Sequence, residues 1–243
     1  MCKEEKVDNI KLSVPKIIVL ALIPGLVILF WAILFSNPFL GINLSIMLSL
    51  MLAILLGLIP TQLGILKYFA MKNKVKIKDV ILFREKISIK RYLLSIFIPL
   101  LIAGLIFVIL PKFELILWGK TFDFIPDWFK VYRFNIDGAD YLTLTIVLVF
   151  LLNGIFGPFV EELYFRGFLL PRMKMFGNFA PLINTVLFSI YHFFTPWENI
   201  TRILAVTPLA YSVWFNKNIN VGIIIHCSLN TFGNIGLLMA ILG

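Results

Sequence analysis

Six polar side chains interrupt long apolar stretches of the sequence, and their types suggest hydrolytic or proton-transfer chemistry. A charged group at the centre of a bilayer costs about 2.5–3.5 kcal/mol, so such residues are usually retained for function. A buried carboxylate can take a proton from water, and histidine or asparagine N–H groups can stabilise an oxyanion. A structural hydrogen bond between helices explains either histidine alone, whereas two histidines beside carboxylates favour catalysis. The six are Glu161, Glu162, Arg166, His192, His226 and Asn230.

The composition is that of a membrane protein. Of the 243 residues, 60% are hydrophobic and 14% are charged, whereas a soluble domain carries about 25% charged residues. Too few polar groups remain to cover a water-facing surface, so lipid must solvate much of the chain. The net charge of +9 comes largely from lysines and arginines placed between apolar runs. This placement favours topology signals and contacts with anionic lipid over binding of nucleic acid.

The apolar runs predict an all-α, polytopic membrane helix bundle. A helix needs about 20 apolar residues to cross the hydrocarbon core, and the sequence offers seven candidate runs. The sixth run has only 13 residues, and it spans only if Ile200 and Thr201 join it while Arg202 reaches the interface. We expect a cytoplasmic N-terminal tail at 1–16 and a single transmembrane bundle at 17–243. The predicted helices are 17–35, 42–66, 92–110, 141–160, 179–194, 203–215 and 221–242.

The distribution of basic residues predicts the orientation of the bundle. The N-terminal tail contains four lysines, and segment 67–91 contains nine lysines and arginines. After two crossings both segments lie on the same side, which the positive-inside rule makes cytoplasmic. Segment 111–140, with five acidic and four basic residues, fits the outside. Seven crossings then place the C-terminus outside.

The first polar cluster is the sequence EELYFR at 161–166. Glu162 and Arg166 are four residues apart and can form an ion pair on one helix face. Glu161 points about 100° away from Glu162, because an α-helix has 3.6 residues per turn. One carboxylate can thus be neutralised while the other stays available. An ordinary ion pair at a cytosolic helix end is the alternative, and this motif alone is a weak signal.

The position of His192 matches that of Glu161 across a predicted helical hairpin. If the turn lies near Gly177, Glu161 comes 16 residues before it and His192 comes 15 residues after it. At a rise of 1.5 Å per residue, both side chains lie about 22–24 Å from the turn. The match requires the fourth helix to continue to about Met175. Alternatively, His192 only caps the outer end of helix 179–194.

The third polar cluster lies in the last predicted helix. His226 and Asn230 are four residues apart, so both project from one helix face,. Their side chains can donate hydrogen bonds to a developing oxyanion. Polar contacts between helices are the alternative, and Asn234, four residues further along, slightly favours it.

The order of the three motifs, EExxxR, FxxxH and HxxxN, resembles the CAAX protease and bacteriocin-processing family. These are intramembrane endopeptidases, also called the Abi or type II CAAX protease family. The run GPFVEELYFRGFL at 157–169 carries much of the resemblance, which covers about 141–230. We accordingly place a catalytic core at about 141–231. Members of the family often have eight membrane helices rather than seven.

The resemblance implies a role for each polar residue. Glu161 would activate a water molecule, and His192 would hold that water. His226 and Asn230 would form the oxyanion hole. The residues implied to support the site are Glu162, Arg166 and Phe188.

Metal use is a separate question for these motifs. Glu161, His192 and His226 could together bind zinc, with one coordination position open for water. The family has been described both as metal-dependent and as glutamate-dependent. We favour a glutamate-type enzyme without a metal and leave zinc as the alternative.

The expected function is that of an endopeptidase whose active site opens toward the cytoplasm. Its partners would be the lipid bilayer and a peptide or prenylated protein substrate, and not nucleic acid. A non-enzymatic immunity or scaffold protein of the same family is the first alternative. A small transporter or proton relay is the second, and the lack of a visible repeat argues against it. Neither the substrate nor the oligomeric state is predicted.

Overall fold

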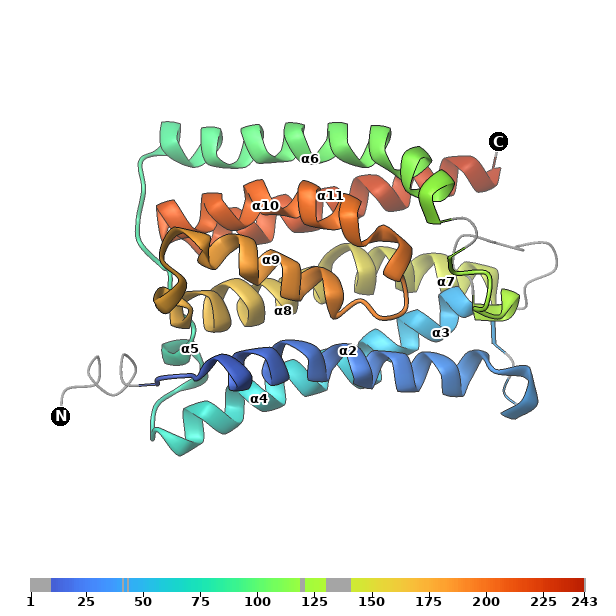
Figure 1. Cartoon of the computed structure of the whole chain (residues 1–243), viewed down its shortest axis with the longest axis horizontal. Helices are drawn as coiled ribbons and strands as arrows, with labels where there is room; N and C mark the ends of the chain where they lie inside the picture. Colours follow the sequence, from blue (N-terminus) through green and yellow to red (C-terminus); the bar gives the residue numbers. More distant parts are fainter. Residues whose placement is uncertain (1–9, 41, 43, 119–120, 130–140, 243) are drawn as a thin grey trace.

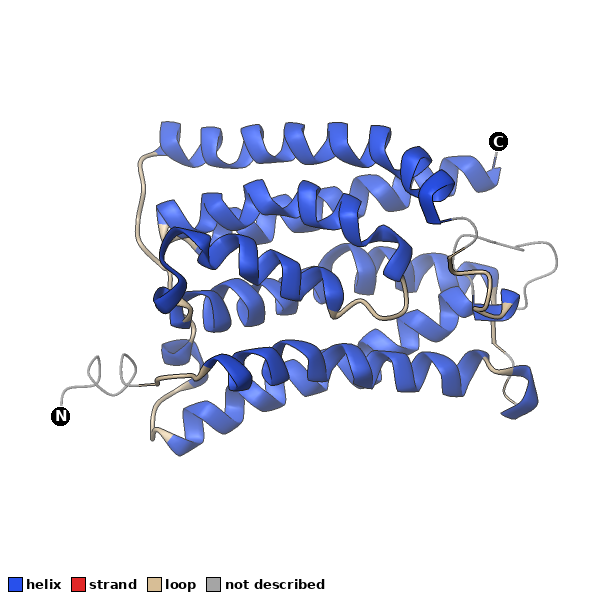
Figure 2. Ribbon diagram, viewed as in Figure 1, coloured by secondary structure: helices blue, strands red, loops and turns tan. Residues whose placement is uncertain are grey.

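The computed structural model describes residues 10–40, 42, 44–118, 121–129 and 141–242. Helices make up nearly all of this part of the chain, and they lie roughly parallel or antiparallel in one bundle (Figures 1 and 2). The described residues contain no strand; a single bridge between Arg84 and Asn218 is their only extended pairing. The predicted all-α class is confirmed.

Five helical stretches of the described chain are long and apolar enough to cross a membrane. They agree with the first, second, third, fourth and seventh predicted helices. Several are built from consecutive segments with different hydrogen-bond registers. The stretches are α2 (Val14–Ser36); α3, η2 and α4 (Ile46–Ala53, Ile54–Leu58, Ile59–Lys72); α6 (Ile89–Trp118); α7, η4, α8, η5 and η6 (Leu142–Leu148, Val149–Phe156, Gly157–Glu162, Leu163–Leu169, Leu170–Arg172); and α11 (Ile219–Leu242).

Two further helices complete the bundle, α9 (Ala180–Ile190) and α10 (Asn199–Asn216). The predicted helix 179–194 is too long, because α9 ends at Ile190. Thr195 adopts an extended φ of −138° before Pro196, as expected for a residue that precedes proline. A short turn, η8 (Pro196–Glu198), then leads into α10. The sixth predicted helix exists, and it begins four residues earlier than expected.

The helix that carries Glu161 departs from regular α geometry on both sides of that residue. Segments η4 and η5 are π-helical, and they flank the single α-helical segment α8. Pro158 has no N–H to donate, and the N–H of Gly157 bonds the carbonyl of Leu152, five residues back. A Cβ on Gly157 would lie 2.6 Å from that carbonyl oxygen. Short π segments often occur at functional sites.

The predicted hairpin turn lies at Gly177. Its φ of +54° is in the left-handed region that glycine adopts without strain,. The preceding long helix ends at Arg172, three residues before the predicted end, and η7 (Lys174–Phe179) makes the turn. The chain therefore reverses direction at the position from which the distances to Glu161 and His192 were counted.

A strap at 80–85 crosses the end of the bundle that carries the basic segment. It follows the short helix α5 (Ile77–Val80) and leads into α6. The N–H of Leu82 donates to the carbonyl of Gly167 at 2.8 Å, and the N–H of Ile219 donates to the carbonyl of Phe83 at 2.8 Å. The strap thus joins the ends of η5 and α11 and helps to close this end of the bundle.

Candidate active site

The two adjacent glutamates face different surroundings. Oε1 of Glu162 lies 3.1 Å from Nη1 of Arg166, and both side chains are fully buried. The predicted ion pair is confirmed, and it lies inside the bundle rather than at a helix end. The Arg166 guanidinium also lies over the Phe188 ring, 4.1 Å from its centroid. Glu161 points elsewhere and lines a cavity.

His226 lies between the two glutamates. Its Nδ1 is 2.9 Å from Oε1 of Glu162, and its Nε2 is 3.8 Å from Oε2 of Glu161. Gly222, one turn earlier on α11, allows this approach. A Cβ there would lie 2.6 Å from Oε2 of Glu162. The absence of a side chain at Gly222 therefore lets α11 pack closely against α8.

His192 approaches Glu161 from the other side. Its Nδ1 lies 2.8 Å from the carbonyl oxygen of Phe188, and a carbonyl can only accept. Nδ1 must therefore carry a proton, which leaves the lone pair of a neutral ring on Nε2. Nε2 lies 3.9 Å from Oε1 of Glu161. The predicted match in depth is confirmed, although His192 lies in the turn after α9 rather than within a helix.

Asn230 belongs to a polar ladder between α11 and η4. Its Nδ2 donates to the carbonyl of Asn153 at 2.8 Å, and Nδ2 of Asn234 donates to the carbonyl of Val149 at 3.1 Å. The side chains of Asn153 and Asn234 also pair, at 2.9 Å. The interpretation as polar contact between helices is therefore correct for Asn234. Asn230 makes such a contact and also lines the cavity, with a second Nδ2 hydrogen left over.

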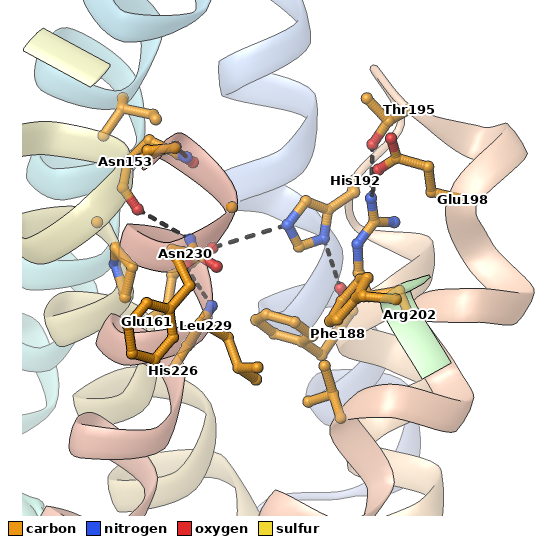
Figure 3. Close-up of a pocket in the computed structure, with 18 of the residues that line it drawn as sticks. Asn153, Glu161, Phe188, His192, Thr195, Glu198, Arg202, His226, Leu229 and Asn230 are labelled. Carbon is orange, nitrogen blue, oxygen red and sulfur yellow. Dashed lines mark hydrogen bonds and ion pairs between the residues drawn. The ribbon is translucent and has the colours of Figure 1, made fainter. Parts of the chain in front are cut away.

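The four predicted catalytic residues meet at one wall of a cavity of about 980 Å³. Figure 3 shows His192 reaching toward the carboxylate of Glu161, with His226 and Asn230 on the adjacent helix. Segments that are 31 and 34 residues apart in the chain thus supply one constellation of carboxylate, two imidazoles and an amide. Such a set can activate water and stabilise an oxyanion.

Comparison with known families agrees with this geometry. Residues 143–232 match the family model described as type II CAAX prenyl endopeptidase Rce1-like. This segment of the chain is similar to the Rce1-like family. The matched segment contains all seven residues that the sequence motifs singled out, and the family is one of proteases. No curated protein and no solved structure gave a significant match.

The matched segment contains a second polar cluster that the motifs did not reveal. Nη2 of Arg202 donates to Oγ1 of Thr195 at 2.7 Å and to Oε2 of Glu198 at 2.6 Å. Arg202 is 8% exposed and lines the cavity, so its side chain lies inside the bundle rather than on its surface. The i,i+4 spacing of Glu198 and Arg202 is a sequence signal for the pair, but nothing local indicates that it borders the active site.

This second cluster holds the turn that carries His192. The N–H of Thr195 donates to the carbonyl of His192 at 2.9 Å. Oγ of Ser189, at the end of α9, donates to the carbonyl of Asn199 at 3.0 Å. Arg202 therefore fastens the turn at Thr195, while Ser189 fastens the base of the turn to α10.

The cavity beside the catalytic residues extends away from the basic end of the bundle. Glu161 lies 11 residues before Arg172, at that end, whereas the lining residue Met47 is the second residue of α3, at the opposite end. Between the catalytic residues and the basic end the bundle is filled by fully buried side chains, which include Phe165, Phe168, Val213 and Ile225. The lining therefore gives no support to an opening on the side of segment 67–91.

The donor types at Glu161, His192 and His226 would suit zinc. In both histidines Nδ1 is hydrogen-bonded to an oxygen acceptor, which leaves Nε2 facing Glu161. Metal-binding histidines commonly have such a partner on the second ring nitrogen. In the part of the chain that the structure describes, however, no group of three His, Cys, Asp or Glu side chains is arranged to hold a metal ion. The distances support a water-sized gap at Glu161, and a chelator experiment decides the question of zinc.

Proposed function

We propose that the chain is an intramembrane endopeptidase that hydrolyses a peptide bond of a membrane-associated or prenylated peptide or protein. Water would be the nucleophile, and Glu161 would be its general base. The similarity of residues 143–232 to a family of endopeptidases supports this proposal, as does the convergence of a buried carboxylate with two imidazoles. The largely apolar lining of the cavity suits a substrate with a lipid-like segment.

The observation that carries the proposal is that two hydrogen-bond acceptors, Nε2 of His192 and the carboxylate of Glu161, face each other. Nε2 of His192 bears a lone pair because Nδ1 is bonded to a carbonyl, and an ionised carboxylate can only accept. Two acceptors that share one water molecule lie about 4–4.5 Å apart, since each hydrogen bond measures about 2.7–2.8 Å and the two bonds meet at roughly 100°. The separation of 3.9 Å between Nε2 and Oε1 fits such a water.

The reaction follows from these positions. The water oxygen attacks the carbonyl carbon of the peptide bond while Glu161 takes one proton from that water. The electron pair of the C=O double bond moves to the carbonyl oxygen. His192 holds the water through its second hydrogen. The tetrahedral intermediate then collapses, the C–N bond breaks, and Glu161 returns the proton to the leaving amine.

The oxyanion would be stabilised by Asn230 and His226. Asn230 has one Nδ2 hydrogen free for this purpose. His226 bonds Glu162 through Nδ1, so donating from Nε2 requires a doubly protonated ring,. Glu162, which also pairs with Arg166, stabilises that cation. Phe188 packs edge-on against both imidazole rings, with centroid distances of 5.0 and 5.6 Å, and so limits their rotation.

We also propose that the N-terminal tail and segment 67–91 face the cytoplasm, since these segments concentrate the basic residues,. The cavity would then extend into the non-cytoplasmic half of the membrane. This differs from the cytoplasmic opening expected from the sequence, and it favours substrates that enter from the bilayer or from outside.

Hydrolysis of a reporter-peptide library by the purified full chain in ¹⁸O-enriched water tests the proposal. The library should include prenylated and unmodified apolar peptides. The expected result is a new carboxyl terminus that carries one ¹⁸O atom from the solvent. A folded chain that cleaves no member of the library, in detergent or in liposomes, would favour the scaffold interpretation.

A further inference from the structure

A second groove uses a different set of α6 residues from the catalytic cavity. It has a volume of about 480 Å³ and is formed by the first part of α6 and the last part of α10. The two cavities share no lining residue. The groove therefore belongs neither to the active site nor to its cavity wall.

The end of the groove nearest segment 67–91 is positively charged. Nε of Arg91 donates to Oδ1 of Asn216 at 2.6 Å, and Nη2 donates to the carbonyl of Phe215 at 3.1 Å. Asn216 is in turn held by Oγ of Ser95, at 2.9 Å. These partners fix the guanidinium but are uncharged, so they leave its positive charge uncompensated.

Lys90 adds a second exposed cation at the same end of the groove. Among the residues that the structure describes, neither Lys90 nor Arg91 forms an ion pair with a carboxylate. The guanidinium is held in one orientation with N–H groups to spare. A phosphate would meet two cations there, one of them preorganised.

The rest of the groove is lined mainly by apolar side chains and runs along α6 away from its first turn. Leu94, Ile98 and Ile102 line it from one face of α6, since they follow one another at intervals of four residues,. From Arg91 to Ile102 the helix rises about 16 Å, which is roughly half the thickness of the hydrocarbon core. Each of the three side chains is more than a third exposed.

We propose that this groove binds an anionic phospholipid, with the phosphate at Lys90 and Arg91 and an acyl chain along α6. A charged head and an apolar tail are both matched, in the order that a lipid of the adjacent leaflet presents them. The fixed Arg91 distinguishes the groove from the other basic residues of segment 67–91, which attract anionic lipid only through general surface charge.

The test compares phosphatidylglycerol with phosphatidylcholine as ligands of the delipidated full chain in neutral detergent. Binding is followed by native mass spectrometry and by the lipid-induced shift in melting temperature. The double variant K90Q/R91Q removes both cations, and K74Q/K76Q is its control, because it removes equal charge from the same segment outside the groove. A third variant, I98W, fills the apolar groove and keeps both cations.

We expect phosphatidylglycerol to bind more tightly than phosphatidylcholine. K90Q/R91Q and I98W should each weaken binding of phosphatidylglycerol about tenfold, and K74Q/K76Q less than about twofold. For each variant, binding of phosphatidylglycerol is compared with binding of phosphatidylcholine. A general loss of stability would affect both lipids and so does not mimic the effect. Equal weakening by the two charge variants, no effect of I98W, equal binding of both lipids, or equal stabilisation by inorganic phosphate would each overturn the proposal.

Discussion

Nε2 of His192 and Oε1 of Glu161 lie 3.9 Å apart, although the turn at Gly177 separates the two residues in the chain. The antiparallel arrangement of α8 and α9 produces this proximity. Because Nδ1 of His192 is bonded to the carbonyl of Phe188, the imidazole presents a fixed acceptor to the space beside the carboxylate.

Removal of the His192 imidazole should impair the chemical step. We expect His192→Ala to lower kcat by about 10²–10⁴-fold, since positioned proton-transfer groups contribute that much. KM should change little, because the ring contacts water rather than the body of the substrate. Steady-state kinetics in liposomes measure both parameters, and a variant with normal kcat would remove His192 from the mechanism.

The buried ion pair between Glu162 and Arg166 should matter for stability as well as for activity. Arg166→Met leaves the Glu162 carboxylate buried without its partner, which costs about 3–5 kcal/mol for a pair of this kind. We expect a large fall in the free energy of unfolding measured in mixed micelles. Glu85→Gln, an exposed surface change, is the control. A stability of Arg166→Met within about 1 kcal/mol of the parent would contradict the burial argument.

Arg202 should act on catalysis through the position of His192. Arg202→Gln breaks the contacts to Thr195 and Glu198 and loosens the turn, so we expect kcat to fall about tenfold, the effect of roughly 1.4 kcal/mol. Arg202→Lys keeps the charge and should recover part of the loss. If both variants changed only the melting temperature, Arg202 would have a purely structural role.

The sequence was sufficient to predict the elements that position the site. The length of the apolar runs located the membrane helices, because crossing a bilayer requires about 20 residues. The i,i+4 spacing predicted the pair of Glu162 and Arg166. Equal distances from Gly177 predicted the contact of Glu161 with His192. Each of these inferences depends only on helix geometry, which is the same in every chain.

Features that depend on packing between distant segments were missed. The burial of Arg202 was missed because Thr195 comes within reach of its guanidinium only when the turn folds back. Asn153 was not singled out, although its side chain and carbonyl pair with α11. The end of α9 was placed too late because the apolar pattern continues through Phe194 after the helix has stopped.

The direction of the cavity can be tested by labelling of single cysteines. In a chain with Cys2→Ser and Cys227→Ser, we expect Met47→Cys to react with a membrane-impermeant maleimide added outside intact cells. Lys74→Cys should react only after the cytoplasmic face is exposed. The reverse pattern would show that the basic segment lies outside and that the cavity opens inward.

The central claim is that the Glu161 carboxylate activates the water that cleaves the peptide bond. The most direct measurement is the turnover number of Glu161→Gln on a peptide that the parent chain cleaves, with the melting temperature of both recorded and with a parallel series in a metal chelator. We predict a loss of about 10²–10⁴-fold in turnover, an unchanged melting temperature, and parent activity that survives the chelator. A well-folded Glu161→Gln chain that retains turnover within about threefold of the parent would contradict the mechanism.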